Sequence, residues 1–233
     1  MRDINEIYQF ALARKGSDCE IFGSLNLKSD LELLKISDDR YLSEISKRVF
    51  QSAFSWKVIE NKWEGFEEVF FKFDVSRLNN ISPDEYENIM SDDRIVRNLR
   101  KVQSVIFNAE FFEQIAKEYG SFGKFLVSWP KDDQYGLYKY LNKNGNRFGI
   151  TTTAYFLRSV GFDAYFLTRD VVKVLLREGV VSSNKSDYAP TSKSDLQAIQ
   201  NAFNVWKSQS DFSYSQISKI LVCSIESDAK ELI

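Results

Sequence analysis

The chain has 233 residues, a formal net charge of −2, 43% hydrophobic residues and 15% aromatic residues. This length and apolar content allow a large buried core, so we expect an ordered protein of one large domain or two lobes. The absence of histidine excludes a Ser-His-Asp triad, a Cys-His nucleophile and any metal site built on imidazole. The slightly acidic balance argues against a broad polyanion-binding surface, although a local basic groove remains compatible with it.

Neither a membrane span nor a secretory leader is indicated, because no apolar run approaches the roughly 18 residues that a membrane-spanning helix needs. The chain has only two cysteines, Cys19 and Cys223, and two thiols cannot complete a four-thiolate zinc site. We interpret both as reduced, buried side chains of a cytoplasmic protein. The sequence therefore predicts a cytoplasmic protein without a metal or another cofactor.

Helical periodicity and capping signals recur along the chain, whereas alternating strand patterns are absent. An apolar stripe from Leu42 to Trp56 predicts one long helix, and a second is expected from about Arg97 to Tyr119. Ser82-Pro83-Asp84-Glu85 has the form of a capping box with proline at the first helical position. Ser192 and Ser213 show the same spacing before Asp195 and Gln216, so each is expected to begin a helix.

A helix, a short polar turn, a second helix and an aspartate follow one another between residues 139 and 178. The turn, Asn142 to Gly149, is too rich in glycine and asparagine to stay helical, and both residue types tolerate positive φ, which favours a tight hairpin. The next helix, starting at Ile150, would present free N–H groups and the positive end of its dipole, which suits a phosphate. Asp170 lies 21 residues after Gly149, behind Thr168, the expected cap of a helix through Leu176.

This arrangement resembles the helix-hairpin-helix DNA glycosylase superfamily. Within it the chain resembles the 3-methyladenine DNA glycosylase I family, and the resemblance covers roughly Asp38 to Gly161. The blocks that carry the likeness are FQSAFSWKVI at 50–59, FEE at 66–68, FD at 73–74, IVRN at 95–98 and Lys101. The family typically has a small zinc site of two cysteines and two histidines, which this chain lacks, so the resemblance is to a divergent member without the zinc ligands.

The resemblance implies an all-α fold of two helical lobes around a cleft. The hairpin-bearing lobe would include about residues 37–161, and the second lobe about residues 1–36 and 162–226. The implied activity is base excision in DNA repair: a base is flipped from the duplex and its N-glycosidic bond is hydrolysed. The base would be an alkylated purine such as 3-methyladenine, and the partner double-stranded DNA, bound by a monomer.

Asp170 is the catalytic residue that the resemblance implies. Cleavage of an N-glycosidic bond develops positive charge on the sugar, and a fixed carboxylate stabilises this charge or orients the attacking water. The alternative is an acidic residue that only complements the dipole of its helix. In lyase members of the superfamily a catalytic lysine lies in the helix after the hairpin. The segment Ile150 to Gly161 has none, so a monofunctional hydrolase is expected.

The base pocket implied by the resemblance contains Phe54, Trp56 and Trp63, because a flipped base needs flat, polarisable walls. Phe54 also lies where the family inserts a small wedge into the duplex. Arg48, Gln51 and Ser55 share one helical stripe and would form a polar edge. Ordinary core packing is the alternative for each aromatic residue.

Arg48 departs most clearly from the family, whose motif has a glutamate eight residues before this tryptophan. A guanidinium beside a cationic base would repel it. Three interpretations remain open: Arg48 pairs with Asp170 and orients it, Arg48 contacts a phosphate or a different base, or Arg48 is a solvated helix residue.

The expected DNA-binding residues are those of the hairpin and of the start of the helix after it. Backbone amides and a helix N-terminus position a duplex without reading its sequence; a polar surface turn is the alternative. The hairpin candidates are Lys143, Asn144, Gly145, Asn146, Arg147, Gly149, Thr151 and Thr152. Arg97 and Asn98, at the start of the long helix, would line the same groove.

Two other functions fit the sequence. One is a non-catalytic DNA-damage-binding protein on the same fold, which the arginine at position 48 and the acidic composition both favour. The other is a helical protein-interaction domain, which would show no salt-dependent binding of DNA.

Overall fold

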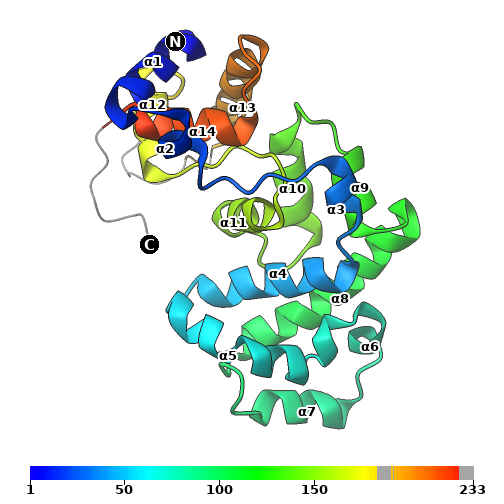
Figure 1. Cartoon of the computed structure of the whole chain (residues 1–233). Helices are drawn as coiled ribbons and strands as arrows, with labels where there is room; N and C mark the ends of the chain where they lie inside the picture. The colour runs from blue at the N-terminus through cyan, green and yellow to red at the C-terminus, as the bar shows by residue number, and fades with distance from the viewer. Residues whose placement is uncertain (183–189, 191, 226–233) are drawn as a thin grey trace. The chain divides into compact units, whose positions relative to one another are not determined.

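The computed structural model describes residues 1–182, 190 and 192–225, and within these residues every regular element is a helix (Figure 1). The predicted all-α class is confirmed. No helix in this part of the chain is long and apolar enough to cross a membrane. The elements are α1 (Ile4–Lys15), α2 (Asp18–Phe22), α3 (Asp30–Leu34), α4 (Asp38–Gln51), α5 (Trp56–Val69), the 3-10 helix η1 (Phe71–Phe73), α6 (Val75–Asn79), α7 (Pro83–Ser91), α8 (Leu99–Tyr119), α9 (Phe122–Ser128), α10 (Gln134–Asn144), α11 (Ile150–Val160), α12 (Arg169–Arg177), α13 (Lys193–Ser208) and α14 (Tyr214–Cys223).

The chain divides into two compact units. Unit 1 consists of residues 1–27, 130–135 and 163–233 as far as they are described, and unit 2 of residues 28–129 and 136–162. Unit 2 begins at residue 28, whereas the sequence predicted that the hairpin-bearing lobe begins at about residue 37. The earlier start follows from two contacts within unit 2: the Lys28 N–H donates to the Gly161 carbonyl at 2.9 Å, and the Tyr41 hydroxyl donates to the Leu33 carbonyl at 2.8 Å. The cleft between two lobes stays a prediction.

Local capping explains where several helices begin. Ser82 and Ser213 form capping boxes with Glu85 and Gln216, and Thr168 caps α12 by accepting from the Val171 N–H. These starts were predicted, because a hydroxyl oxygen satisfies an N–H group that the helix itself leaves unpaired. The predicted stripe from Leu42 to Trp56 is interrupted, since α4 ends at Gln51 and α5 begins at Trp56.

The long helix α8 forms the centre of unit 2. One face buries Val102, Val105, Ala109 and Phe112, and α4, α6 and α9 pack against α8. Phe112 stacks on Phe122 with ring centroids 4.2 Å apart and an interplanar angle of 2°. Aromatic side chains dominate this core, and their large apolar area stabilises unit 2.

Lys101, near the start of α8, is buried with 3% of its surface exposed. Its Nζ donates to the carbonyls of Val49 and Phe50 at 2.7 and 3.0 Å, and lies 4.7 Å from the centroid of the Phe54 ring. Burial, together with the charge of Arg147, lowers the pKa of Lys101 to about 8. The side chain thus satisfies the end of α4, where helix carbonyls lack intrahelical partners.

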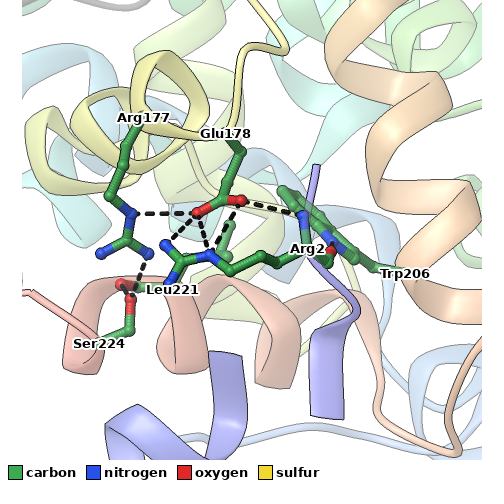
Figure 2. Close-up of polar contacts among 6 residues, drawn as sticks. All are labelled: Arg2, Arg177, Glu178, Trp206, Leu221 and Ser224. Atoms are coloured by element: carbon green, nitrogen blue, oxygen red, sulfur yellow. Dashed lines mark hydrogen bonds and ion pairs between the residues drawn. The ribbon is translucent and has the colours of Figure 1, made fainter. Parts of the chain in front are cut away.

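Glu178 joins the N-terminal residues to the end of α12 in unit 1 (Figure 2). Its carboxylate accepts from the Arg2 backbone N–H at 3.0 Å, from Arg2 Nη2 at 2.5 Å and from Arg177 Nε at 3.0 Å. The Arg2 carbonyl in turn accepts from the indole of Trp206 at 3.0 Å. Burial alone would raise the pKa of Glu178, but the hydrogen bonds from Arg2 and Arg177 outweigh it and bring the pKa to about 2.

The two cysteines are free, but only Cys223 is buried. The prediction of a buried thiol is wrong for Cys19, because α2 is a five-residue helix whose only buried side chain is Ile21. Among the described residues no group of three or more cysteine or acidic side chains could hold a metal ion.

Lys101→Met should lower the free energy of unfolding by about 2–4 kcal/mol. Methionine keeps the apolar stem but removes the Lys101 donor from the Phe50 carbonyl and one of the two donors from the Val49 carbonyl, which also accepts from Ser52 Oγ. Leaving a buried polar group unpaired costs about 1–3 kcal/mol. Urea unfolding followed by circular dichroism measures the loss. Lys117→Met is the matched control, since Lys117 is exposed on the same helix; equal losses in both variants would contradict a capping role for Lys101.

Glu178→Gln should cost about 3 kcal/mol near neutral pH, as expected when one partner of a buried ion pair is removed. Because the pKa of Glu178 is lowered in the folded state, its contribution is complete above the ordinary value of 4.5 and disappears as the pH falls toward 2. Unfolding experiments from pH 7 to pH 2.5 should therefore show that the difference in unfolding free energy between wild type and Glu178→Gln becomes smaller as the pH falls. A difference in unfolding free energy that stays constant in acid would refute this account. Glu113→Gln is the control, because Glu113 forms an exposed pair with Lys117; its unfolding free energy should stay close to that of the wild type at every pH.

Candidate functional site

The hairpin between α10 and α11 is shorter than the sequence predicted. Asn142, Lys143 and Asn144 still belong to α10, and the Gly145 N–H continues the helical pattern by donating to Leu141 at 2.9 Å. Asparagine was expected to end the helix, but the Asn144 amide bonds to the Tyr140 carbonyl at 2.8 Å, one turn back. The turn itself consists of residues 145–149.

Positive φ occurs in this turn at Arg147, with a value of 64°, and at neither glycine. Gly145 is required for a different reason: a Cβ there would lie 2.4 Å from the Phe148 ring. Phe148 is buried and packs edge-on against Phe111 and Phe156. The hairpin is therefore closed over its own phenylalanine, and close approach rather than backbone freedom explains Gly145.

Asn108 of α8 holds the hairpin in place. This side chain is completely buried, and its amide both accepts from the Asn146 N–H at 2.7 Å and donates to the Asn146 carbonyl at 3.1 Å. Sequence reasoning missed Asn108, although an asparagine within the apolar face of a long helix is the signal that could have revealed it. The paired bonds give the turn a defined position on α8.

The N-terminus of α11 has no capping side chain. Gly149 is the N-cap residue and its carbonyl accepts from the Thr153 N–H at 2.8 Å. The first N–H groups of an α-helix have no intrahelical partner, so those of Ile150, Thr151 and Thr152 carry the positive end of the helix dipole. Thr151 is exposed and Thr152 half-buried.

Exposed cationic side chains occur in the hairpin and near the start of α8 in unit 2. Arg147 is exposed, and its Nε donates to the Arg100 carbonyl at 3.3 Å, which joins the hairpin to the start of α8. Lys143 and Arg97 are also exposed. Asn98 has a structural task, since its side chain accepts from the Lys101 N–H at 3.2 Å and caps α8.

Arg48, Gln51 and Trp56 form a second cluster, which we call the Arg48 cluster. Arg48 donates to Gln51 Oε1 at 2.8 Å and to Glu44 Oε1 at 2.7 Å, and its guanidinium lies 5.5 Å from the centroid of the Trp56 ring. Tyr155 of α11 meets Trp56 edge-on at 5.3 Å. The aromatic pair connects this cluster to the helix that the hairpin opens.

The other predicted pocket residues lie elsewhere in unit 2. Trp63 stacks on Phe66 and Phe73 and donates its indole N–H to Glu67 at 3.2 Å. Phe54 lies over the Nζ of Lys101. Ser55 does not share a stripe with Arg48 and Gln51, because α4 has ended and Ser55 is the N-cap residue of α5. Tyr155 was missed; its position five residues into a helix on the far side of the hairpin carries no sequence signal.

Asp170 lies in the first turn of α12 in unit 1, as predicted. Its carboxylate is 13% exposed and pairs with Lys173 Nζ at 3.3 Å. Arg48 is not a solvated residue, since 17% of its side chain is exposed and it is engaged with Glu44 and Trp56. A catalytic role for Asp170 stays a prediction.

Residues 34–144 match the sequence model of the methyladenine glycosylase family. This segment contains the Arg48 cluster and α8 with Lys101 and Asn108, and it ends at the last residue of α10. The match includes residues 38–144 of the predicted resemblance, whereas residues 145–161, with the hairpin turn and α11, lie outside it.

Three solved structures are similar. A variant of 3-methyladenine DNA glycosylase I in complex with 3-methyladenine is 23% identical, with a TM-score of 0.49 over 55% of this chain and 80% of that one. The Staphylococcus aureus 3-methyladenine DNA glycosylase I is 25% identical, with a TM-score of 0.49 over 55% and 79% of the two chains. The Methanocaldococcus jannaschii 8-oxoguanine glycosylase/lyase, bound to DNA containing 8-oxoguanine, is 14% identical, with a TM-score of 0.52 over 93% and 95%.

The last likeness spans nearly the whole chain and shows that the chain shares the fold of that glycosylase. The chain contains no histidine and only two cysteines. By its match over residues 34–144, which are just under half of its 233 residues, this protein is similar to the methyladenine glycosylase family.

Proposed function

We propose that this protein holds double-stranded DNA through the hairpin between α10 and α11, receives a flipped alkylated purine such as 3-methyladenine, and hydrolyses its N-glycosidic bond. The observation that carries the proposal is the hairpin itself. In a chain similar to this family, two hydrogen bonds from Asn108 fix a turn whose following helix has an uncapped N-terminus.

The hairpin offers a DNA phosphate three kinds of contact. The first-turn amides of α11 supply hydrogen bonds and the positive end of a dipole. The Thr151 hydroxyl adds a donor, and the exposed Arg147 and Lys143 add positive charge. Contacts of this kind position the protein on the backbone whatever the base sequence is. A net charge of −2 is compatible with this, because the positive charge is local.

The Arg48 cluster is the proposed site for the flipped base. Trp56 is 39% exposed and supported from the side by Tyr155, so its indole is available for stacking while its orientation is fixed. Stacking replaces what a base loses when it leaves the duplex. Phe54, in the loop that follows the α4 carbonyls bound by Lys101, is proposed as the wedge that fills the gap.

Asp170 is the proposed catalytic residue. The C1′–N bond breaks with its electron pair on the purine, and the sugar becomes positively charged. Water adds to C1′, and its proton passes to solvent or to the base. The carboxylate stabilises the charged sugar or orients the water. With no lysine in α11, a Schiff base with the sugar is not expected, so the enzyme is proposed to be monofunctional. We also propose that it acts as a monomer in the cytoplasm.

A non-catalytic damage-binding function is the second candidate, and the Arg48 guanidinium against Trp56 favours it. A cation there opposes the positively charged bases that leave most easily. The two functions differ in one product, the free base.

Asp170→Asn should reduce the single-turnover release of alkylated purines from methylated duplex DNA by about 100-fold or more, the usual effect of removing a group that stabilises developing charge. Binding to an abasic-site analogue should change little. Asp163→Asn is an unsuitable control, because Asp163 accepts from the N–H groups of Tyr214 and Ser215; Asp195→Asn, at the exposed start of α13, is preferable. Unchanged release by Asp170→Asn would exclude its role, and binding without any release by the wild type would indicate the damage-binding function.

Arg147→Asn should weaken the binding of undamaged duplex DNA and reduce the slope of log Kd against log salt by about 1, as expected for one lost phosphate contact. Asparagine is chosen because it tolerates the positive φ of this position. Lys117→Gln removes an exposed charge from α8 and is the control. A slope that falls equally in both variants, or in neither, would show that the hairpin does not hold the phosphate.

A further inference from the structure

The orientation of the Gln51 amide is determined by Arg48. A guanidinium only donates hydrogen bonds, so Gln51 must present its Oε1 to Arg48 Nη1, at 2.8 Å. The NH2 group of the same amide is then directed away from Arg48. Gln51 is 4% exposed, and its Nε2 is buried without a hydrogen-bond partner among the described residues.

An unpaired buried amide donor is costly, at about 1–3 kcal/mol. Native structures rarely retain one without a reason. Here it belongs to the side chain that adjoins Arg48, and Arg48 in turn lies against the exposed Trp56. The cluster therefore combines an aromatic surface with a donor that requires an acceptor.

The charge of the cluster points the same way. The guanidinium lies 5.5 Å from the centroid of Trp56, and the ring attracts one cation over its face. A cationic base stacked on this indole would lie at a similar distance from the positive charge of Arg48. The two like charges would repel each other, in surroundings that screen less than water. Glu44 pairs with Arg48, and it is the guanidinium of this pair that lies against the Trp56 ring.

We propose that the Arg48 cluster selects uncharged alkylated purines that present a hydrogen-bond acceptor, and disfavours purines that alkylation has made cationic. Gln51 Nε2 is the specificity-determining donor, and Arg48 both orients it and repels cationic bases. This inference rests on the proposed function, because it names the substrate class of the same site. It departs from 3-methyladenine as the example, because adenine alkylated at N3 is cationic in DNA and would be disfavoured by Arg48.

The chemistry of an uncharged base fits these donors. When its C1′–N9 bond breaks, the electron pair leaves the purine negatively charged until it takes a proton from the attacking water. A hydrogen bond from Gln51 and the nearby positive charge of Arg48 stabilise this developing charge. A cationic base becomes neutral on leaving, so it develops no negative charge for either group to stabilise.

Binding can be tested separately from excision. Duplexes with one 2′-fluorinated lesion nucleotide, which resists cleavage, would contain either 1,N6-ethenoadenine, which is uncharged, or 7-methylguanine, which is cationic. The quantity measured is the ratio of the two Kd values for each protein variant. This ratio does not depend on the fraction of correctly folded protein, so a partly unfolded variant still reports it. Release of the same two bases from unfluorinated duplexes is measured in parallel.

The wild type should bind the ethenoadenine duplex more tightly than the methylguanine duplex. Arg48→Gln should shift the ratio by about tenfold toward the cationic base, because it removes one charge. Gln51→Glu keeps the size of the side chain but replaces the donor by an acceptor, and should shift the ratio in the same direction. Lys47→Gln is the matched control, since Lys47 lies on the same helix 5.1 Å from the centroid of Trp63, and it should leave the ratio unchanged.

The outcomes separate the inference from the proposed function. Tighter binding of 7-methylguanine by the wild type, or a ratio that Arg48→Gln and Gln51→Glu leave unchanged, would overturn the inference, whereas release of either base would still support a glycosylase. The expected ratio without release of any base would support the inference and refute the glycosylase. Equal affinity for both lesions and for undamaged duplex would overturn the two together.

Discussion

Two polar side chains on one face of α8 determine how the functional parts of unit 2 are placed. Lys101 and Asn108 are seven residues apart, which is two helical turns, and both are buried. Lys101 binds the last carbonyls of α4, before the loop with Phe54 and the start of α5. Asn108 binds the backbone of Asn146 in the hairpin. One rigid helix thus positions both the proposed wedge and the proposed phosphate contact.

This arrangement relies on a few polar side chains in an aromatic core, and each must lie where its hydrogen-bond partners are. An unpaired amide or ammonium group would be expensive there, so Lys101 and Asn108 each tolerate one geometry. Arg147 is electrostatically linked to this system, because its charge contributes to the lowered pKa of Lys101.

The Arg48 cluster is the proposed base site, and it differs from the family motif in its side chains. The helix α4 and the match over residues 34–144 place Arg48, Gln51 and Trp56 in the family segment. Within it a guanidinium is bound by Glu44, orients Gln51 and lies against Trp56. The site retains an aromatic surface for a base, while its polar edge donates hydrogen bonds and carries positive charge. Substrate choice then follows from side chains rather than from the backbone.

Several features were evident from the sequence because they are local. Helical periodicity, the capping boxes at Ser82 and Ser213, the cap at Thr168 and the position of Asp170 in the first turn of its helix depend on residues within a few positions of one another. The same is true of the family blocks, which identified the fold class and the similarity to the family. One local error arose where two signals competed, at the end of α10, where Asn144 bonds back to its own helix.

Contacts between distant segments were decided by the tertiary structure alone. No spacing rule joins Asn108 to Asn146 or Trp56 to Tyr155, because these pairs meet through the packing of whole helices. The sequence also left three roles open for Arg48, since a side chain of this length reaches several partners and only the folded helix selects among them. The sequence by itself therefore determined most of the helices, the presence of the hairpin and the similarity to the methyladenine glycosylase family. The tertiary structure decided which side chains share a site, because burial and hydrogen bonding between distant residues set that choice.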